Sequence, residues 1–183
     1  MYRGALTLLK YGNLVLRIFG IDPGLQRTGW GIIDVEGNRL KHVSHGVIQT
    51  DAKTDTPVRL TYIFMELTRL INLWQPTQAA IEETFVNKNP ASSLKLGLAR
   101  GVGMMAPANL GLTVSEYPAN LVKKSVVGAG HAEKEQVQMM IKVLLPGVVA
   151  VADAADALAV AICHAHHGLT RAKVGGIMSG GVR

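Results

Sequence analysis

The chain has 183 residues, which is long enough for one domain with a hydrophobic core, because single domains usually run to about 100–200 residues. Its apolar fraction of 48% and its 20 glycines fit an α/β protein, and its formal net charge of +6 favours acidic partners such as nucleic acid. The single cysteine, Cys163, excludes an intramolecular disulfide and indicates a reducing, cytoplasmic setting.

The first two strands predict a β-hairpin that carries an acidic residue at its tip. The apolar strand 15–21 ends at Asp22, Pro23-Gly24 turns the chain, and a second apolar run, 29–33, returns beside the first. After a further turn, residues 39–50 predict a third antiparallel strand. We expect a phosphate backbone to approach the acid closely, because glycines without side chains surround it at positions 20, 24, 29 and 31. Asp-Pro-Gly is also common turn chemistry, so this motif alone leaves the function of Asp22 open.

The next segment predicts a strand, a helix and a second strand that runs parallel to the first. Thr56 as N-cap and Pro57 at the first helical position begin an amphipathic helix, and Pro76 ends it. Residues 78–83 then form a short strand, because a helical crossover joins parallel neighbours. Glu82 therefore lies at the C-terminal end of a second strand.

Asn89-Pro90 begins a helix predicted over 91–108, which holds Gly97 and Gly101 on one face. Small residues let another backbone approach closely, and that backbone belongs either to the protein's own sheet or to a partner subunit. The longest apolar region, 94–112, overlaps this helix. Two basic residues and a proline make it a poor membrane span, so we expect no membrane partner.

The remaining periodic segments are a strand over 113–117 and helices over 120–127, 132–145 and 153–167. The whole pattern predicts a single α/β domain over 15–167. Its five-stranded mixed sheet has three antiparallel strands followed by two parallel strands, with helices on both faces. We expect residues 1–14 to be an N-terminal extension and residues 168–183 to be a flexible tail.

Four acidic residues stand at the ends of otherwise apolar elements. Asp22 and Glu82 end strands, while Asp153 and Asp156 share one face at the start of the last helix. The helix dipole, worth about 0.3–1 kcal/mol, accounts well for one acid there and less well for two. Converging carboxylates without basic partners repel one another and need a cation, and such oxygen ligands suit Mg²⁺ or Mn²⁺. Two ions about 3.5–4 Å apart activate water in phosphodiester cleavage, so no catalytic Ser or Cys is required.

Five motifs follow one another between about residues 15 and 166. They are Ile21-Asp22-Pro23-Gly24 with Thr28-Gly29, Ala80-Ile81-Glu82-Glu83 with Phe85, Lys95-Leu96-Gly97 with Ala99-Arg100-Gly101, Val126-Val127-Gly128 with Ala132-Glu133-Lys134, and Asp153-Ala154-Ala155-Asp156-Ala157-Leu158. In order and spacing these motifs resemble the RuvC family of bacterial Holliday junction resolvases.

The resemblance implies a ribonuclease H-like fold and an endonuclease that resolves four-way DNA junctions by paired symmetric nicks, in recombination and repair. It implies that Asp22, Glu82, Asp153 and Asp156 are the catalytic residues and bind two Mg²⁺ ions, for which Mn²⁺ can substitute. It also implies a homodimer and cooperation with the RuvA and RuvB branch-migration proteins. Some members of the family carry His at the position of Asp153, where this chain keeps a carboxylate.

Basic residues outnumber acidic ones between residues 84 and 145, where seven Lys/Arg stand against three Glu, a net charge of +4. Within this region, the residues that we expect to bind DNA are Phe85, Lys88, Lys123, Lys124 and Lys134. By the resemblance, Lys123 and Lys134 contact phosphates near the cut; the alternative is an ordinary solvated lysine. Phe85 can stack on junction bases or wedge between them, although without the resemblance it would be interpreted as a core residue.

Three other functions stay open: an actin-like ATP-binding protein, a ribonuclease H-like nuclease that acts on RNA, and a junction-binding module that has lost activity. Actin-like proteins need two related lobes and a longer chain, and four intact acids argue against the inactive module. The histidines at 164, 166 and 167 look like a metal cluster, but they begin about 16 Å along the helix from Asp153 and cannot join that site. The helix dipole favours histidines at a helix C-terminus in any case.

Overall fold

The computed structural model describes residues 15–83 and 89–178, with 169–178 described as backbone only. In this part of the chain, five strands form one mixed sheet in the order β3-β2-β1-β4-β5. The first three strands pair antiparallel, and the last two run parallel to β1, as predicted. The strands are β1 (Leu16–Asp22), β2 (Arg27–Glu36), β3 (Arg39–Gln49), β4 (Gln78–Glu83) and β5 (Thr113–Pro118).

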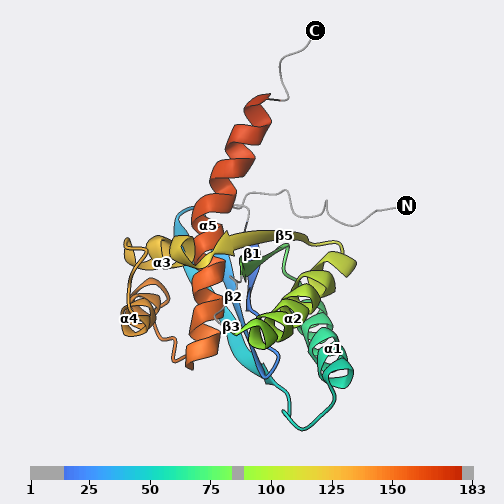
Figure 1. The fold of residues 1–183 in the computed structure, drawn as a ribbon. Coiled ribbons are helices and arrows are strands. Elements are labelled where there is room, and N and C mark those ends of the chain that lie inside the picture. Colours follow the sequence, from blue (N-terminus) through green and yellow to red (C-terminus); the bar gives the residue numbers. More distant parts are fainter. Residues whose placement is uncertain (1–14, 84–88, 179–183) are drawn as a thin grey trace, which may run out of the picture.

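Helices cover both faces of the sheet (Figure 1). One face packs against α1 (Thr56–Trp74) and α2 (Pro90–Asn109), and the other against α3 (Ala119–Val127), α4 (Lys134–Leu144) and α5 (Ala152–Met178). Each face has its own core because successive residues of a strand point to opposite sides. Ile18 and Ile33 pack with α3, α4 and α5, whereas Phe19 and Ile32 pack with α1 and α2.

Glycines of β1 and β2 allow α5 to lie directly on the sheet. A Cβ atom at Gly20 would overlap the backbone of α5, and one at Gly29 would overlap the carbonyl group of Asp153. Gly31 leaves room for α5 in the same way, and Gly24 faces the backbone of its own turn. The expectation that these glycines admit a phosphate backbone is therefore wrong, because the protein's own chain fills the space.

The glycines of α2 divide into two groups. Within the part of the chain that the structure describes, a Cβ atom at Gly97 or Gly101 would have no neighbour within 4 Å outside its own helix. At Gly103 the same atom would lie 2.9 Å from Cδ1 of Ile81, so this glycine brings α2 close to the sheet. Gly97 and Gly101 therefore do not seat α2 on the described sheet, and the approach of a second chain stays a prediction.

Several helix ends differ from the prediction, most of them by one residue, and three of these differences have an identifiable cause. Asp55 rather than Thr56 is the N-cap of α1, because the first helical hydrogen bond runs from the N–H of Arg59 to the carbonyl of Asp55. The first residue of α4 is Lys134 rather than residue 132, because the side chains of Glu133 and Gln136 form a capping box.

The third difference is the C-terminal end of α5, which reaches Met178 instead of stopping near residue 167. No proline follows residue 167, and a single glycine costs a helix about 1 kcal/mol without ending it. Figure 1 shows the end of α5 extending away from the sheet. The domain limits of 15–167 stay a prediction. Nowhere in the described ranges is a helix both long enough and apolar enough to cross a membrane.

Candidate active site

Two carboxylates stand together at the C-terminal ends of neighbouring parallel strands. The pairing of β1 with β4 places Ile21 opposite Ile81, and Asp22 and Glu82 each follow one residue later. Asp22 lies on the face that α5 covers, since it alternates with Gly20 along β1. The sheet therefore brings together two of the four predicted acids.

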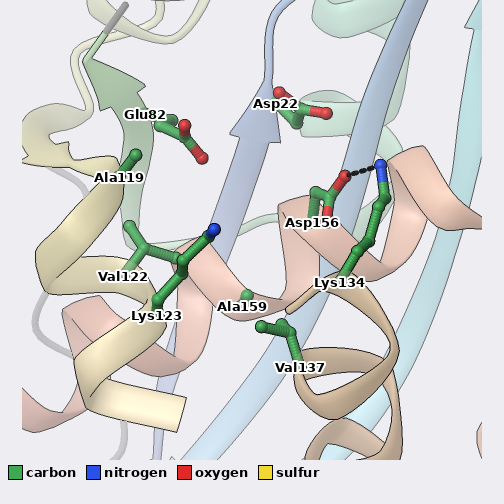
Figure 2. A pocket seen from close by; sticks show the side chains of 9 residues that line it. All are labelled: Asp22, Glu82, Ala119, Val122, Lys123, Lys134, Val137, Asp156 and Ala159. Atoms are coloured by element: carbon green, nitrogen blue, oxygen red, sulfur yellow. Dashed lines mark ion pairs between the residues drawn. The ribbon is translucent and has the colours of Figure 1, made fainter. Parts of the chain in front are cut away.

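The third acid, Asp156, reaches the same place from α5. It lines a cavity of about 270 Å³ together with Asp22 and Glu82. The other lining residues are Ala119, Val122 and Lys123 of α3, Lys134 and Val137 of α4, and Ala159 of α5. Figure 2 shows carboxylates from β1, β4 and α5 around a space that two lysine side chains enter from α3 and α4. Elements far apart in the sequence thus form one site.

The acids strongly perturb one another. Burial and then the negative charges of Asp156, Glu82 and Asp153 raise the pKa of Asp22 to about 8, although Lys134 acts in the opposite direction. Burial and Asp156 also raise the pKa of Glu82. Burial is the largest cause of the shift at Asp22, and the charge of Lys134 offsets the neighbouring acids only in part.

Two lysines provide the positive charge of the cavity. Lys134 Nζ lies 2.9 Å from Oδ2 of Asp156, and this hydrogen bond raises the pKa of the lysine. Lys123 lines the cavity from the last turns of α3, with its ammonium group directed into the open space (Figure 2). Both cations lie where they could meet an anionic oxygen that enters beside the acids.

The fourth acid, Asp153, is turned elsewhere. Its Oδ2 accepts a hydrogen bond of 2.6 Å from Nε of Arg27, and it does not line the cavity. Sequence reasoning missed Arg27 because the second strand was predicted to begin at residue 29, whereas β2 begins at Arg27 itself. The feature of the sequence that could have identified Arg27 is its position across the hairpin turn from Asp22.

Whether the acids suit a metal ion is decided by their donor atoms and their present orientation. Among the described residues, no group of three or more His, Cys, Asp or Glu side chains is positioned to hold an ion. The donor chemistry fits a divalent cation, because three carboxylates line one cavity. Asp153 and Asp156 are at present paired with Arg27 and Lys134, respectively.

The remaining predicted DNA contacts are placed differently. Phe85 and Lys88 lie outside the described residues. Lys124 is exposed on α3 and does not line the cavity. Of the three predicted contacts that lie within the described residues, Lys123 and Lys134 line the cavity with the acids.

The C-terminal histidines are tied to other groups. His164 is buried, and its ring nitrogens lie 2.8 Å from the hydroxyl of Tyr117 and 2.7 Å from Oε1 of Gln78. His167 pairs with the hydroxyl of Ser125 at 3.0 Å. The dipole explanation for these histidines is wrong because α5 continues past them to Met178, and His164 instead joins α5 to two strands.

A family model described as crossover junction endodeoxyribonuclease RuvC matches residues 18–164. The chain belongs to the RuvC family. It is 58% identical over 161 residues to the RuvC of Gluconobacter oxydans, covering 87% of this chain and 96% of that protein. With the RuvC of Paramagnetospirillum magneticum it shares 59% identity over 160 residues, with the same coverage of 87% and 96%.

Solved RuvC structures share the fold. The Thermus thermophilus RuvC in complex with a Holliday junction substrate superimposes with a TM-score of 0.79 at 28% identity, over 85% of this chain and 96% of that one. The ribonuclease H-like architecture is therefore confirmed. As a RuvC family member, the chain is a crossover junction endodeoxyribonuclease that resolves four-way DNA junctions.

Proposed function

We propose that Asp22, Glu82, Asp153 and Asp156 are the carboxylates that perform the cleavage, in a site that requires divalent metal. The observation that carries this assignment is the convergence of Asp22, Glu82 and Asp156 on one cavity of about 270 Å³, where burial and the neighbouring acids also raise the pKa of Asp22 to about 8. A cluster of this kind is under electrostatic stress that a cation relieves. RuvC nucleases are metal-dependent, and the chemistry of an all-oxygen donor set favours two Mg²⁺ ions, with Mn²⁺ as a substitute.

Divalent cations held there would supply the Lewis acidity that phosphodiester hydrolysis needs. The chain itself positions the reacting groups. Asp22 and Glu82 provide fixed oxygens at the tips of two paired strands, and Asp156 provides another from a helix that lies directly on those strands. Lys123 and Lys134 bind phosphate oxygens at the cavity mouth, and Phe85, Lys88 and Lys124 extend the contact to the junction.

We also infer that the active species is a two-fold homodimer that works with RuvA and RuvB in the cytoplasm. Symmetric resolution of a four-way junction needs two cuts related by a dyad, and each chain provides one cavity of this kind among its described residues. The outward face of α2 supports this inference, since Leu94, Leu98 and Met105 are 73%, 48% and 53% exposed beside two open glycines. Met104 of the same helix packs partly into the core instead.

A nicking assay on a synthetic four-way junction with Mg²⁺ tests the assignment. Asp22→Asn and Glu82→Gln should abolish cleavage and leave junction binding nearly intact or slightly tighter, because each replaces a DNA-facing carboxyl group with a neutral amide that binds a metal ion poorly and does not repel phosphate. Glu135→Gln is the matched control, since it changes an exposed acid in the first turn of α4 outside the cavity. Near-normal nicking by either cavity variant overturns the assignment. Structured RNA offered in parallel excludes the RNA nuclease if it stays uncut.

A further inference from the structure

Asp153 is held at the edge of the site by a contact that the reaction does not explain. Its Oδ2 lies 2.6 Å from Nε of Arg27, the first residue of β2, while the cavity is lined by Asp22, Glu82 and Asp156 without it. Asp153 and Asp156 share a helix face, so the difference between them lies in the direction of one side chain.

We propose that Arg27 is a positioning residue that holds Asp153 outside the carboxylate cavity until a divalent cation binds. The inference rests on the proposed function, because it concerns how one proposed ligand reaches the ion. In the metal-free chain Arg27 takes the place of the cation, and on binding the carboxylate leaves the guanidinium for the ion.

The backbone around Asp153 leaves side-chain rotation as the way to make this exchange. Gly29 lies under the carbonyl of Asp153 so closely that a Cβ atom there would overlap it, which fixes the helix on the strand. The hairpin register pairs Gly29 with Asp22, and Arg27 shares a strand face with Gly29. Asp153 therefore stands between Arg27 on one side and Asp22 on the other, and turning its side chain exchanges one neighbour for the other.

The ion pair between Arg27 and Asp153 is weak enough for a metal ion to displace it. The side chains of Arg27 and Asp153 are 42% and 28% exposed, so solvent weakens their attraction. Ion pairs at this exposure change an equilibrium constant by a factor of about 1.5–5. A divalent ion among several carboxylates attracts Asp153 more strongly than this ion pair does. In the metal-free chain, the guanidinium of Arg27 keeps the charge of a fourth carboxylate out of the cavity.

The test measures Mn²⁺ binding by isothermal titration calorimetry, without DNA, on the purified full chain. Arg27→Gln and Arg27→Ala should both tighten Mn²⁺ binding about two- to fivefold, because the ion no longer displaces the guanidinium. Arg69→Gln is the matched control, since it removes the same charge from an exposed pair with Glu66 on α1, on the other face of the sheet. Circular dichroism verifies that every variant is folded.

Repeating Arg27→Gln in an Asp153→Asn background separates an effect through Asp153 from a general effect of removing a positive charge. If Arg27 acts through Asp153, the tightening of Mn²⁺ binding disappears in this background, because the paired carboxylate is gone. Unchanged or weaker Mn²⁺ binding by the Arg27 variants overturns the proposal, and so does equal tightening in both backgrounds. If the wild-type chain binds no Mn²⁺, the proposed metal site itself is wrong. If the wild-type chain binds Mn²⁺ and cleaves junctions, but the Arg27 variants bind Mn²⁺ with unchanged affinity, only the role of Arg27 is refuted.

Discussion

At the scale of single residues, Asp22 has a carboxyl group whose pKa burial and neighbouring acids raise far above its ordinary value. Its pKa of about 8 means that the folded, metal-free chain retains a proton that the unfolded chain releases near pH 4. Between these values the native state binds more protons than the unfolded state, so stability falls as the pH rises. The contribution of Asp22 is fully present below about pH 4 and is lost as the pH passes through 8.

We therefore predict that Asp22→Asn stabilises the metal-free protein by an amount that grows from pH 4 to 8 and then levels off. The amide stays neutral throughout, whereas the carboxyl group must ionise in a buried, negative site. Each kcal/mol of the difference moves the melting temperature of a domain this size by about 2–4 °C. Thermal unfolding in chelator at pH 5, 7 and 9 measures it, and a constant offset between the two proteins contradicts the raised pKa.

The two cavity lysines lead to a prediction about affinity. Lys123→Ala and Lys134→Ala should weaken binding to DNA of any sequence, and each should reduce the slope of log affinity against log salt by about one unit. Junction titrations by fluorescence anisotropy at several salt concentrations provide the slope. Arg69→Ala on α1 should leave it unchanged. A loss of affinity with an unaltered slope means that the lysine acts on the fold rather than on a phosphate.

At the scale of elements, the glycines of β1 and those of α2 look alike in the sequence but meet different surroundings. Gly20 faces the backbone of α5, and Gly97 faces open space. Hydrophobic periodicity predicted both elements, yet it could not tell which glycine another element would cover. That distinction depends on packing between segments distant in the chain.

Gly20→Ala should therefore destabilise the fold by about 1–3 kcal/mol or more, because α5 has to move off the sheet. Gly97→Ala adds the same methyl group without a clash and should change stability by less than about 1 kcal/mol, in the direction of a better helix. Urea unfolding followed by circular dichroism compares the two. Equal stability of both variants would show that α5 adjusts freely, which contradicts the close contact.

The elements also show where prediction from sequence stops. The strand directions and the two strand-end acids followed from alternation, turn residues and the parallel crossover, all of which are local patterns. The Arg27 contact with Asp153 and the packing of His164 between Tyr117 and Gln78 could not be predicted, because they join residues far apart in sequence. Helix ends depended on particular hydrogen bonds, as at Asp55.

At the scale of the whole molecule, the outward face of α2 leads to the prediction of assembly. Gly101→Leu places a bulky side chain where two helices would approach, while leaving the protein's own sheet untouched. We expect a folded monomer that nicks one strand without resolving the junction. Light scattering and a paired-cut assay measure both properties, with Thr61→Leu on α1 as the control. A variant that remains a dimer and resolves junctions places the interface elsewhere.

The position of α5 near the C-terminal end of the described chain has a consequence for the protein during its synthesis. Asp22 and Glu82 belong to strands made early in synthesis, whereas Asp153 and Asp156 belong to the last described element, which also covers one face of the sheet. On the ribosome, a growing chain therefore carries two of the four proposed catalytic acids on a sheet with one face uncovered. Under the proposed assignment, cleavage activity begins only when α5 emerges and packs, which is also the step that completes the core.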